Sequence, residues 1–261
     1  MENAPIYQVD AFTDKLFKGN PAAVCLLGSW PSDDILQGIA QENNLPETAF
    51  LVNNDQGFDI RWFTPTVEVD LCGHATLASA HVLFTIRKSD QKSIVFNSKS
   101  GPLTVVNHGD HLTMDFPADV PTSDQQVPGL LEALGLSAGK IFRGKTDFMV
   151  VLDNQEDVIN ISPDFPKLKQ LPVRGVIVTA SGNDTDFVSR FFAPASGIDE
   201  DPVTGSAHCT LTPYWSERLG KTKLTALQLS TRVGELGCEL VGDRVKLSGT
   251  AVTYLTGIIH Y

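Results

Sequence analysis

Two stretches of the 261-residue chain resemble each other, and this internal repeat constrains the fold more than any other feature of the sequence. The motif RWFTP at residues 61–65 is matched 129 positions later by RFFAP at residues 190–194. After an acidic stretch, each motif is followed by a glycine that opens a segment rich in small residues, Gly73 in CGHAT and Gly205 in TGSAH. Two matched features in the same order indicate a duplication, so the sequence predicts two similar halves.

The boundary between the halves is predicted from proline content. Residues 117–128 (PADVPTSDQQVP) contain three prolines and few apolar side chains, which is typical of a linker. We therefore expect a first half over residues 1–116, a linker over residues 117–128 and a second half over residues 129–261.

Short apolar or alternating runs, which are typical of strands, outnumber helical patterns in both halves. Helices are expected over residues 32–41, 74–87 and 206–219, with Pro213 kinking the last of them. This mixture predicts an α+β fold rather than a regular alternation of strands and helices. The expected strands are residues 6–9, 22–27, 48–52, 60–63, 94–96, 103–107, 112–116, 147–152, 175–179, 187–192, 227–231, 238–241, 244–247 and 251–259.

Charge and composition exclude several classes of protein. The 31 acidic and 20 basic residues give a net charge of −11, which argues against nucleic acid as the main partner because a phosphate backbone requires a basic face. The N-terminal residues lack the pattern of a signal or transit peptide, and no apolar run approaches the ~18 residues that a membrane helix needs. Widely spaced cysteines in such a chain are expected to be free thiols in a cytoplasmic protein: Cys25, Cys72, Cys209 and Cys238.

The two glycine-opened helices offer a place to bind an anion. A helix N-terminus carries unpaired backbone N–H groups and the positive end of the helix dipole, and a glycine lets a ligand approach the backbone closely. Helix starts at Gly73 and Gly205, facing each other across a cleft between the halves, would hold a carboxylate without any arginine or lysine. Either glycine alone is more often a tight strand-to-helix turn, and the repetition favours the binding site.

Few acid–base side chains lie close to these turns in the sequence. His74 follows the first glycine, Asp201 precedes the second by four residues, and Glu47 begins an apolar strand. Glu68 and Asp70 precede the first glycine much as Asp201 precedes the second. Each has a plain alternative: His74 as a structural histidine, Asp201 as a charge on a solvated loop, and Glu47 as a charge at the rim of a strand. Proton abstraction beside an electron-withdrawing group needs a base and an acid, and one carboxylate from each half, with His74 as a shuttle, supplies them without a cofactor.

The chain resembles the PhzF family, the phenazine biosynthesis-like proteins related to diaminopimelate epimerase. The motifs that carry the resemblance occur in the family's order over about the first 210 residues, and the remaining strands fit in length and pattern. These motifs are VDAFT at 9–13, GNPAAV at 19–24, PETAF at 46–50, RWFTP at 61–65, LCGHATL at 71–77 and EDPVTGSA at 200–207.

The resemblance implies two similar α+β halves, each a curved, barrel-like sheet around a central helix, with the last strand returning to the first half. It implies a homodimer that uses neither a metal nor an organic cofactor and isomerises a small carboxylate-bearing substrate by proton shifting. It assigns the family's catalytic glutamate, histidine and aspartate to Glu47, His74 and Asp201. The expected substrate-binding residues are Gly73, Gly205, Ser206 and Asp70.

Cys72 marks a difference from the epimerase relatives, which use one cysteine from each half as a paired acid and base. Cys72 occupies the first of these positions, whereas residues 201–203 (Asp-Pro-Val), with Pro202 in the closest alignment, occupy the second. We therefore expect no two-thiol racemisation, a buried structural Cys72, and a Cys209 in the core of its helix.

Residues 139–146 (GKIFRGKT) match the phosphate-binding loop pattern of nucleotide-binding proteins. That loop follows a strand and opens a helix. Here a helix-like segment precedes the motif and a strand-like run follows it, so we expect no nucleotide site.

Two classes of function remain open. The first is a cofactor-independent isomerase or epimerase, and the second is a protein of the same fold that binds small molecules or partners without turnover. The presence of Glu47, His74 and Asp201 together favours the enzyme, because a binding protein has no need of all three.

Overall fold

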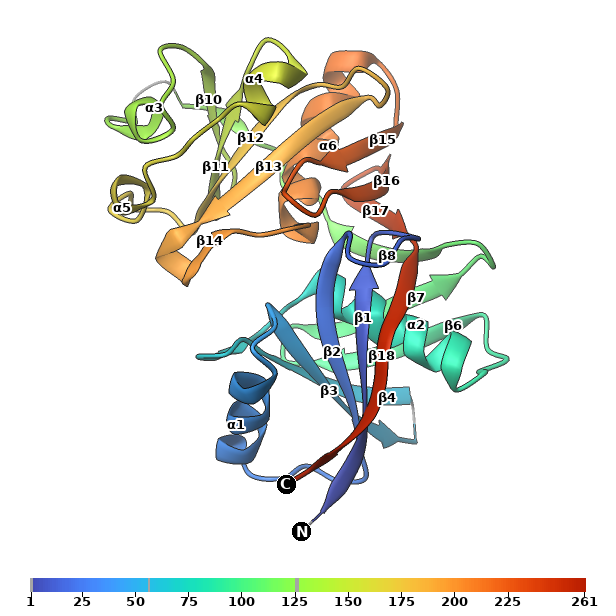
Figure 1. The fold of residues 1–261 in the computed structure, drawn as a ribbon. Helices are drawn as coiled ribbons and strands as arrows, with labels where there is room; N and C mark the ends of the chain where they lie inside the picture. Colours follow the sequence, from blue (N-terminus) through green and yellow to red (C-terminus); the bar gives the residue numbers. More distant parts are fainter. Residues whose placement is uncertain (1, 56, 125–126) are drawn as a thin grey trace. The chain divides into compact units, whose positions relative to one another are not determined.

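The chain divides into two compact units in the computed structural model, which describes residues 2–55, 57–124 and 127–261 (Figure 1). Unit 1 comprises Met1–Asp115 and Ser248–Tyr261, and unit 2 comprises Phe116–Leu247. The segment expected as a linker belongs to unit 2, where its described part contributes a short strand, β9 (Thr122–Ser123). Residues 125 and 126 of that segment lie outside the described residues.

Unit 1 consists mainly of strands, with two helices that differ in burial. Its strands are mostly short, and one of them comes from the C-terminal end of the chain. In chain order the elements are β1 (Asn3–Ala11), β2 (Asn20–Leu27), α1 (Asp33–Asn43), β3 (Glu47–Asn54), β4 (Gly57–Phe63), β5 (Glu68–Val69), α2 (Gly73–His81), a π-helical turn (Val82–Ile86), β6 (Ser93–Ser98), β7 (Gly101–Asn107), β8 (Leu112–Pro117) and β18 (Ala251–His260).

The strands of unit 1 form one curved sheet of mixed direction. β1 pairs antiparallel with both β2 and β18, so the last strand of the chain lies beside the first. β2 and β3 run parallel, β3 and β4 antiparallel, and β4 and β6 parallel, with β7 and β8 following as antiparallel neighbours. Because β2 and β3 are parallel, their first residues, Asn20 and Glu47, lie at the same end of the sheet.

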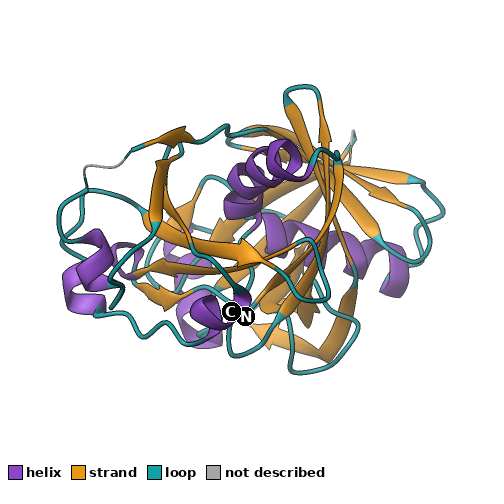
Figure 2. Cartoon of the chain, turned by 90° about the horizontal axis from the view of Figure 1, so that it is seen from above, coloured by secondary structure: helices purple, strands orange, loops and turns teal. Residues whose placement is uncertain are grey.

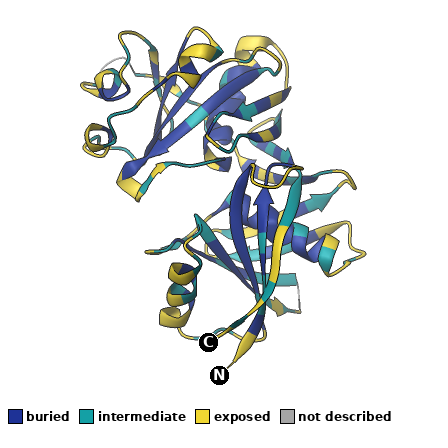
Figure 3. Ribbon diagram, viewed as in Figure 1, coloured by how far each residue is buried: buried dark blue, intermediate teal, exposed yellow. Residues whose placement is uncertain are grey.

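Helix α2 is the central element of unit 1. Residues 74–80 of this helix are all buried, and Figure 3 shows it as a buried helix among strands. A helix that is buried on every side must be apolar or small-chained all round, and the sequence GHATLASAH meets this requirement. Its hydroxyl groups are satisfied internally, since Thr76 and Ser79 each donate to a carbonyl four residues earlier. The helix therefore forms a rigid base for whatever its first turn carries.

Unit 2 repeats this plan with more irregular connections. As in unit 1, a long buried helix follows a short strand and precedes a final group of antiparallel strands. Beyond β9 its elements are α3 (Leu130–Ala133), β10 (Lys140–Arg143), β11 (Asp147–Val151), α4 (Gln155–Ile159), α5 (Phe165–Leu168), β12 (Gly175–Ser181), β13 (Phe187–Ala193), a 3-10 turn (Pro194–Ser196), β14 (Ile198–Glu200), α6 (Gly205–Leu219), β15 (Lys223–Gln228), β16 (Gly234–Val241) and β17 (Arg244–Gly249).

The pairing of strands confirms the internal repeat. β11 and β12 run parallel as β2 and β3 do, β12 and β13 antiparallel as β3 and β4 do, and β13 and β15 parallel as β4 and β6 do. Strand dominates in both units, as Figure 2 shows. The chain therefore has the expected α+β architecture, in which each unit is a curved sheet around a central helix.

The repeated RxF motif has the same structural role in each unit. Arg61 stacks on the ring of Phe63 at 5.1 Å and makes a two-pronged hydrogen bond to Glu68. Arg190 stacks on Phe192 at 4.9 Å and binds Glu200 in the same way. Both pairs fasten the short strand that leads into the central helix, so the motif positions the helix start rather than taking part in chemistry.

Several sequence expectations about single elements were wrong. The strand expected over residues 227–231 is β15, which begins at Lys223 and ends at Gln228. The helix expected over residues 74–87 ends as α2 at His81 and continues as a π-helical turn. Helix α6 includes Pro213, and the kink expected there stays a prediction. The GKIFRGKT motif spans the hairpin of β10 and β11, so it lacks the strand-to-helix geometry of a phosphate-binding loop, as expected. Among the described helices, none is long and apolar enough to span a membrane.

Candidate active site

A cluster of polar side chains lies at the start of α2 in unit 1. Cys72 is the N-cap of this helix, and His74 is its second residue. Glu47 is the first residue of β3, and the parallel register places it opposite Ala22 of β2, two residues beyond Asn20. The sequence thus brings these four side chains together from the helix start and the ends of two parallel strands.

His74 is the centre of the cluster. Its Nε2 lies 3.1 Å from Glu47 Oε2, and its Nδ1 lies 3.1 Å from Asn20 Nδ2 and 3.6 Å from Cys72 Sγ. The side chains of Glu47 and His74 are only 13% and 5% exposed, and neither Glu47 Oε2 nor His74 Nε2 has a hydrogen-bond partner elsewhere among the described residues. A glutamate and a histidine are therefore held face to face in a largely desolvated position.

Burial and charge act in opposite directions on this pair. Burial of the imidazole lowers the pKa of His74, but Cys72 and Glu47 raise it, and the net direction is upward. The Cys72 thiol is itself fully buried, and this burial raises its pKa, so at neutral pH it is a neutral thiol. Glu47 is then the neighbour whose charge favours the imidazolium form of His74.

The donor atoms of Glu47, Cys72 and His74 all lie within 4.8 Å of one another, which makes them the candidate metal ligands among the described residues. The imidazole, however, stands between the other two groups, with Nδ1 toward Cys72 and Nε2 toward Glu47. A metal ion binds one nitrogen of a histidine in its ring plane. One ion therefore cannot take all three ligands in this arrangement, in which the imidazole contacts Cys72 on one side and Glu47 on the other.

Unit 2 carries a different set of side chains at the start of α6. Arg174 binds the buried Asp147 through both prongs of its guanidinium, stacks on Phe191 at 5.4 Å and donates to Ser206 Oγ at 2.9 Å. Ser206 is the second residue of α6, as His74 is of α2. An arginine that the sequence reasoning did not foresee therefore stands at this helix start.

Asp201 also lies beside this helix start. Thr204, the N-cap of α6, donates from its hydroxyl to Asp201 Oδ2 at 2.5 Å. Gln228 bridges the same segment, because its side chain accepts from Thr204 N at 2.8 Å and donates to the carbonyl of Asp201 at 2.7 Å. Asp201 is thus half-buried and fixed within the loop that leads into α6, where its Oδ2 accepts from Thr204.

The two helix starts occupy equivalent places but hold different chemistry. Counting from the helix N-caps, Thr204 stands in unit 2 where Cys72 stands in unit 1, so Thr204 rather than Pro202 is the internal counterpart of Cys72. Either way, no second thiol is present at that position. Unit 1 supplies a glutamate and a histidine, whereas unit 2 supplies an arginine, a serine and an aspartate.

Other predicted residues have structural or peripheral positions. Glu68 is fully engaged by Arg61 and Lys99, which hold the pKa of its carboxyl down near 2. Asp70 is exposed, and the contact that fixes it is its backbone carbonyl, which accepts from Ser100 Oγ at 2.8 Å. Its role as a substrate-binding residue remains a prediction. All four cysteines are buried and free, as expected, and Cys209 lies in the core of α6.

Sequence reasoning missed Asn20 and Arg174. Asn20 lies within the GNPAAV motif, but its link to His74 spans 54 residues and depends on how β2 packs against α2. Arg174 meets Asp147 because β11 and β12 run parallel, which places Asp147 opposite Gly175. For Arg174 the available signal was a pair of opposite charges, Asp147 and Arg174, each at the start of an apolar run.

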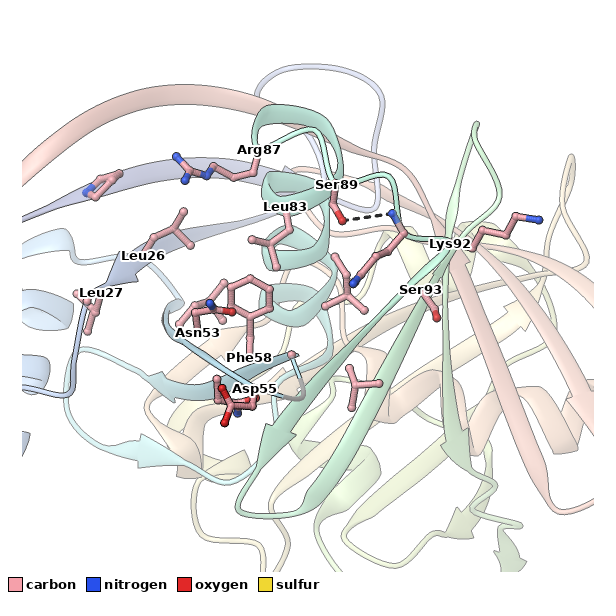
Figure 4. A pocket seen from close by; sticks show the side chains of 18 residues that line it. Leu26, Leu27, Asn53, Asp55, Phe58, Leu83, Arg87, Ser89, Lys92 and Ser93 are labelled. Atoms are coloured by element: carbon pink, nitrogen blue, oxygen red, sulfur yellow. Dashed lines mark hydrogen bonds between the residues drawn. The ribbon is translucent and has the colours of Figure 1, made fainter.

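A cavity in unit 1 lies away from both clusters. It has a volume of about 1110 Å³ and is lined in unit 1 by residues that include Leu26, Asn53, Phe58, Arg87 and Lys92 (Figure 4). None of the predicted site residues lines it. The chemistry of the cluster, and not the size of the cavity, therefore identifies the candidate active site.

Comparison with known proteins identifies the family. The model of the phenazine biosynthesis-like (PhzC–PhzF) proteins matches residues 9–257, so the chain belongs to this family. It is 53% identical over 257 residues to an uncharacterized isomerase of Pseudomonas aeruginosa, with 98% of each chain covered. A solved PhzF-family structure from Enterococcus faecalis matches with a TM-score of 0.96 at 47% identity, over the full length of both chains. Relatives at 47–53% identity are named isomerases, so the chain is an enzyme of the isomerase class.

More distant structures confirm the fold class. A hydroxyproline epimerase from Agrobacterium vitis matches with a TM-score of 0.63, covering 98% of this chain and 92% of that one. At 10% identity this likeness concerns the fold alone. The diaminopimelate epimerase-like architecture that the sequence predicts is thereby confirmed.

Proposed function

We propose that this enzyme is a cofactor-independent isomerase or epimerase that transfers a proton at carbon on a small carboxylate-bearing metabolite. The buried pair of Glu47 and His74 at the start of α2 is the observation that carries the proposal. A carboxylate held in a desolvated position beside a nitrogen base is a typical arrangement for general acid–base catalysis.

In the proposed reaction Glu47 is the base. It takes a proton from a carbon next to an electron-withdrawing group, the C–H bond breaks, and its electron pair moves into the conjugated system of the substrate. The proton then returns to a different carbon or to the opposite face of the same carbon. The step is redox-neutral, because the substrate regains the proton that it lost.

The start of α6 in unit 2 is proposed as a binding site for a carboxylate. Arg174 and Ser206 present donors at the start of the 15-residue helix α6, where backbone N–H groups are also unpaired. Arg174 is held in place by the buried Asp147, so little side-chain entropy is lost when it binds an anion. Gly205 would let the ligand approach the backbone, and Gly73 would do the same at α2.

Asp201 is proposed as the second carboxyl group of the reaction. It supplies or accepts the second proton of the reaction. Its position is supported by the hydrogen bonds of Thr204 and Gln228, which fix the loop that carries it. Asp201→Asn should then slow turnover while leaving affinity for the substrate nearly unchanged.

The experiment that tests the function is a screen for solvent-deuterium uptake. Amino acids and cyclic hydroxy or amino acids are incubated with the protein in D₂O and analysed by mass spectrometry. Enzyme-dependent uptake of one deuterium into a carboxylate-bearing compound supports the proposal and gives the substrate class. The methyl ester of the same compound should bind much more weakly in a thermal-shift assay, and equal stabilisation by acid and ester would contradict the proposed carboxylate site.

The competing function is a small-molecule-binding or interaction protein of the same fold. It predicts thermal stabilisation by a carboxylate ligand with no deuterium uptake by that ligand. Homodimer formation and a cytoplasmic location remain predictions from the sequence, and sedimentation of the purified protein tests the first of them.

A further inference from the structure

Asn20 is a fully buried polar side chain that contacts His74 directly. It begins β2 immediately after Gly19, whose φ of +62° ends the loop from β1. A Cβ at Gly19 would lie 2.1 Å from the carbonyl oxygen of Ala11, so only glycine permits this tight turn. The backbone that carries Asn20 is therefore closely constrained.

The contact restricts the protons on the imidazole. The amide nitrogen of Asn20 has hydrogens and no acceptor site, so in the neutral imidazole the His74 Nδ1 that it faces at 3.1 Å is the acceptor. The neutral thiol of Cys72, 3.6 Å from the same nitrogen, is a second donor toward it. In the neutral imidazole the single proton then lies on Nε2, on the side of Glu47.

We propose that Asn20 is a positioning residue that fixes the tautomer of His74, so that His74 Nε2–H is a donor toward Glu47. This inference rests on the proposed function for its catalytic meaning, but the tautomer itself is independent of it. A nitrogen that already bears a proton cannot take one from Glu47. Glu47 therefore carries the transferred proton itself, and His74 orients the carboxylate instead of acting as the shuttle that the sequence favoured.

The other groups around His74 do not reverse this assignment. Helix α2 packs against β1, β2, β3 and β18. The ionisable neighbours that act on His74 are Cys72 and Glu47, and the buried Asp10 of β1 is engaged by the backbone N–H of Phe17. Glu47 favours a protonated imidazole, whereas the Asn20 amide opposes a proton on Nδ1. The two neighbours thus compete, and removing the amide donor should favour the imidazolium.

The tautomer can be measured directly by NMR on protein labelled with ¹⁵N in its histidines. Spectra are recorded on the full chain while the pH is raised until His74 is neutral, and its signals are assigned by their loss in His74→Gln. The expected result is an unprotonated Nδ1 and a protonated Nε2. A neutral His74 with its proton on Nδ1 would overturn the proposal, whatever the enzyme's substrate.

Two variants test the role of the amide. Asn20→Asp replaces the donor with an acceptor, so the proton should move to Nδ1 and the pKa of His74 should rise by one unit or more. Asn20→Leu removes the donor without adding charge and should also raise that pKa. Asn53→Asp adds the same charge at an exposed position of unit 1, near the opposite end of β3 from Glu47, and should leave His74 unchanged.

Catalysis provides a separate readout. In the deuterium-uptake assay, Asn20→Asp should lower kcat by at least tenfold with KM changed less than threefold. An unchanged tautomer and pKa in a folded Asn20→Asp protein would overturn the inference. Failure of the proposed function has a different signature, because the wild-type NMR result would stand while no compound exchanged its proton.

Discussion

His208 provides a quantitative test of how α6 is held, because it is a buried titratable group away from the proposed chemistry. Its ring lies in the apolar core 5.9 Å from that of Phe187, Nδ1 donates to the carbonyl of Thr204 at 2.8 Å, and Nε2 is buried without a hydrogen-bond partner in the described structure. Burial lowers the pKa of His208 to about 4, against an ordinary value of 6.5. The folded protein therefore keeps this histidine neutral.

The sign of the effect on stability follows from this depressed pKa. As the pH falls, the unfolded chain binds a proton at His208 near pH 6.5, whereas the folded protein binds one only near pH 4. The contribution is fully present above pH 6.5 and is lost as the pH falls to about 4. A shift of one pKa unit corresponds to about 1.4 kcal/mol, so the full loss is about 3 kcal/mol, and about 2 kcal/mol is lost at pH 5.

The perturbation is His208→Gln, which removes the titration while keeping a polar side chain of similar length. Urea unfolding of wild type and variant is followed by circular dichroism at pH 7.5, 6 and 5. The free energy of unfolding of the wild type should fall by about 2 kcal/mol relative to the variant between pH 7.5 and 5. Other groups titrate equally in both proteins, so their contributions cancel. A constant gap between wild type and His208→Gln over this pH range would refute the reasoning.

Three further substitutions test the scaffold and the anion site. Gly19→Ala should lower the free energy of unfolding by at least about 2 kcal/mol in urea titrations, because the φ of Gly19 is positive and a Cβ there would meet a backbone oxygen. The control Gly28→Ala has open space around its Cβ and should cost under about 1 kcal/mol. Similar costs for the two variants would refute this account. Arg190→Gln should cost about 2–3 kcal/mol in the same assay, since it leaves the half-buried Glu200 without its partner, and a loss below about 0.5 kcal/mol would contradict the structural role of the motif. Arg174→Gln should weaken the thermal stabilisation given by a carboxylate ligand at least tenfold in ligand concentration, and unchanged affinity would remove Arg174 from the anion site.

The repeat and the helix starts could be predicted because each is written locally in the sequence. The RxF motif has its aromatic partner two residues away, and both central helices begin at a glycine. The family's motifs name Glu47 and His74 as site residues, and the structure adds the contact between them. Such features can be predicted from the sequence because they depend on neighbouring residues or on an ordered set of motifs.

The errors have physical causes that lie outside any short window. Strand β15 was misplaced because its exposed Lys223 and buried Gln228 contradict the usual polarity of a strand. Gln228 can be buried only because Thr204 and Asp201, more than twenty residues earlier, satisfy its amide. Arg174 was missed for the same reason, since its partner Asp147 becomes a neighbour through a parallel pair of strands. The local sequence pattern could not predict which buried polar groups pair over long distances in the sequence.

The most direct test of the central claim, that Glu47 moves a proton at carbon, compares wild type with Glu47→Gln in D₂O on a compound that exchanges. Deuterium incorporation is measured by mass spectrometry and binding by thermal shift, with Glu42→Gln on the exposed face of α1 as the matched control. The account predicts a loss of exchange of about 100-fold or more in Glu47→Gln, with ligand affinity retained and the control unchanged. Equal exchange rates in wild type and Glu47→Gln would contradict it.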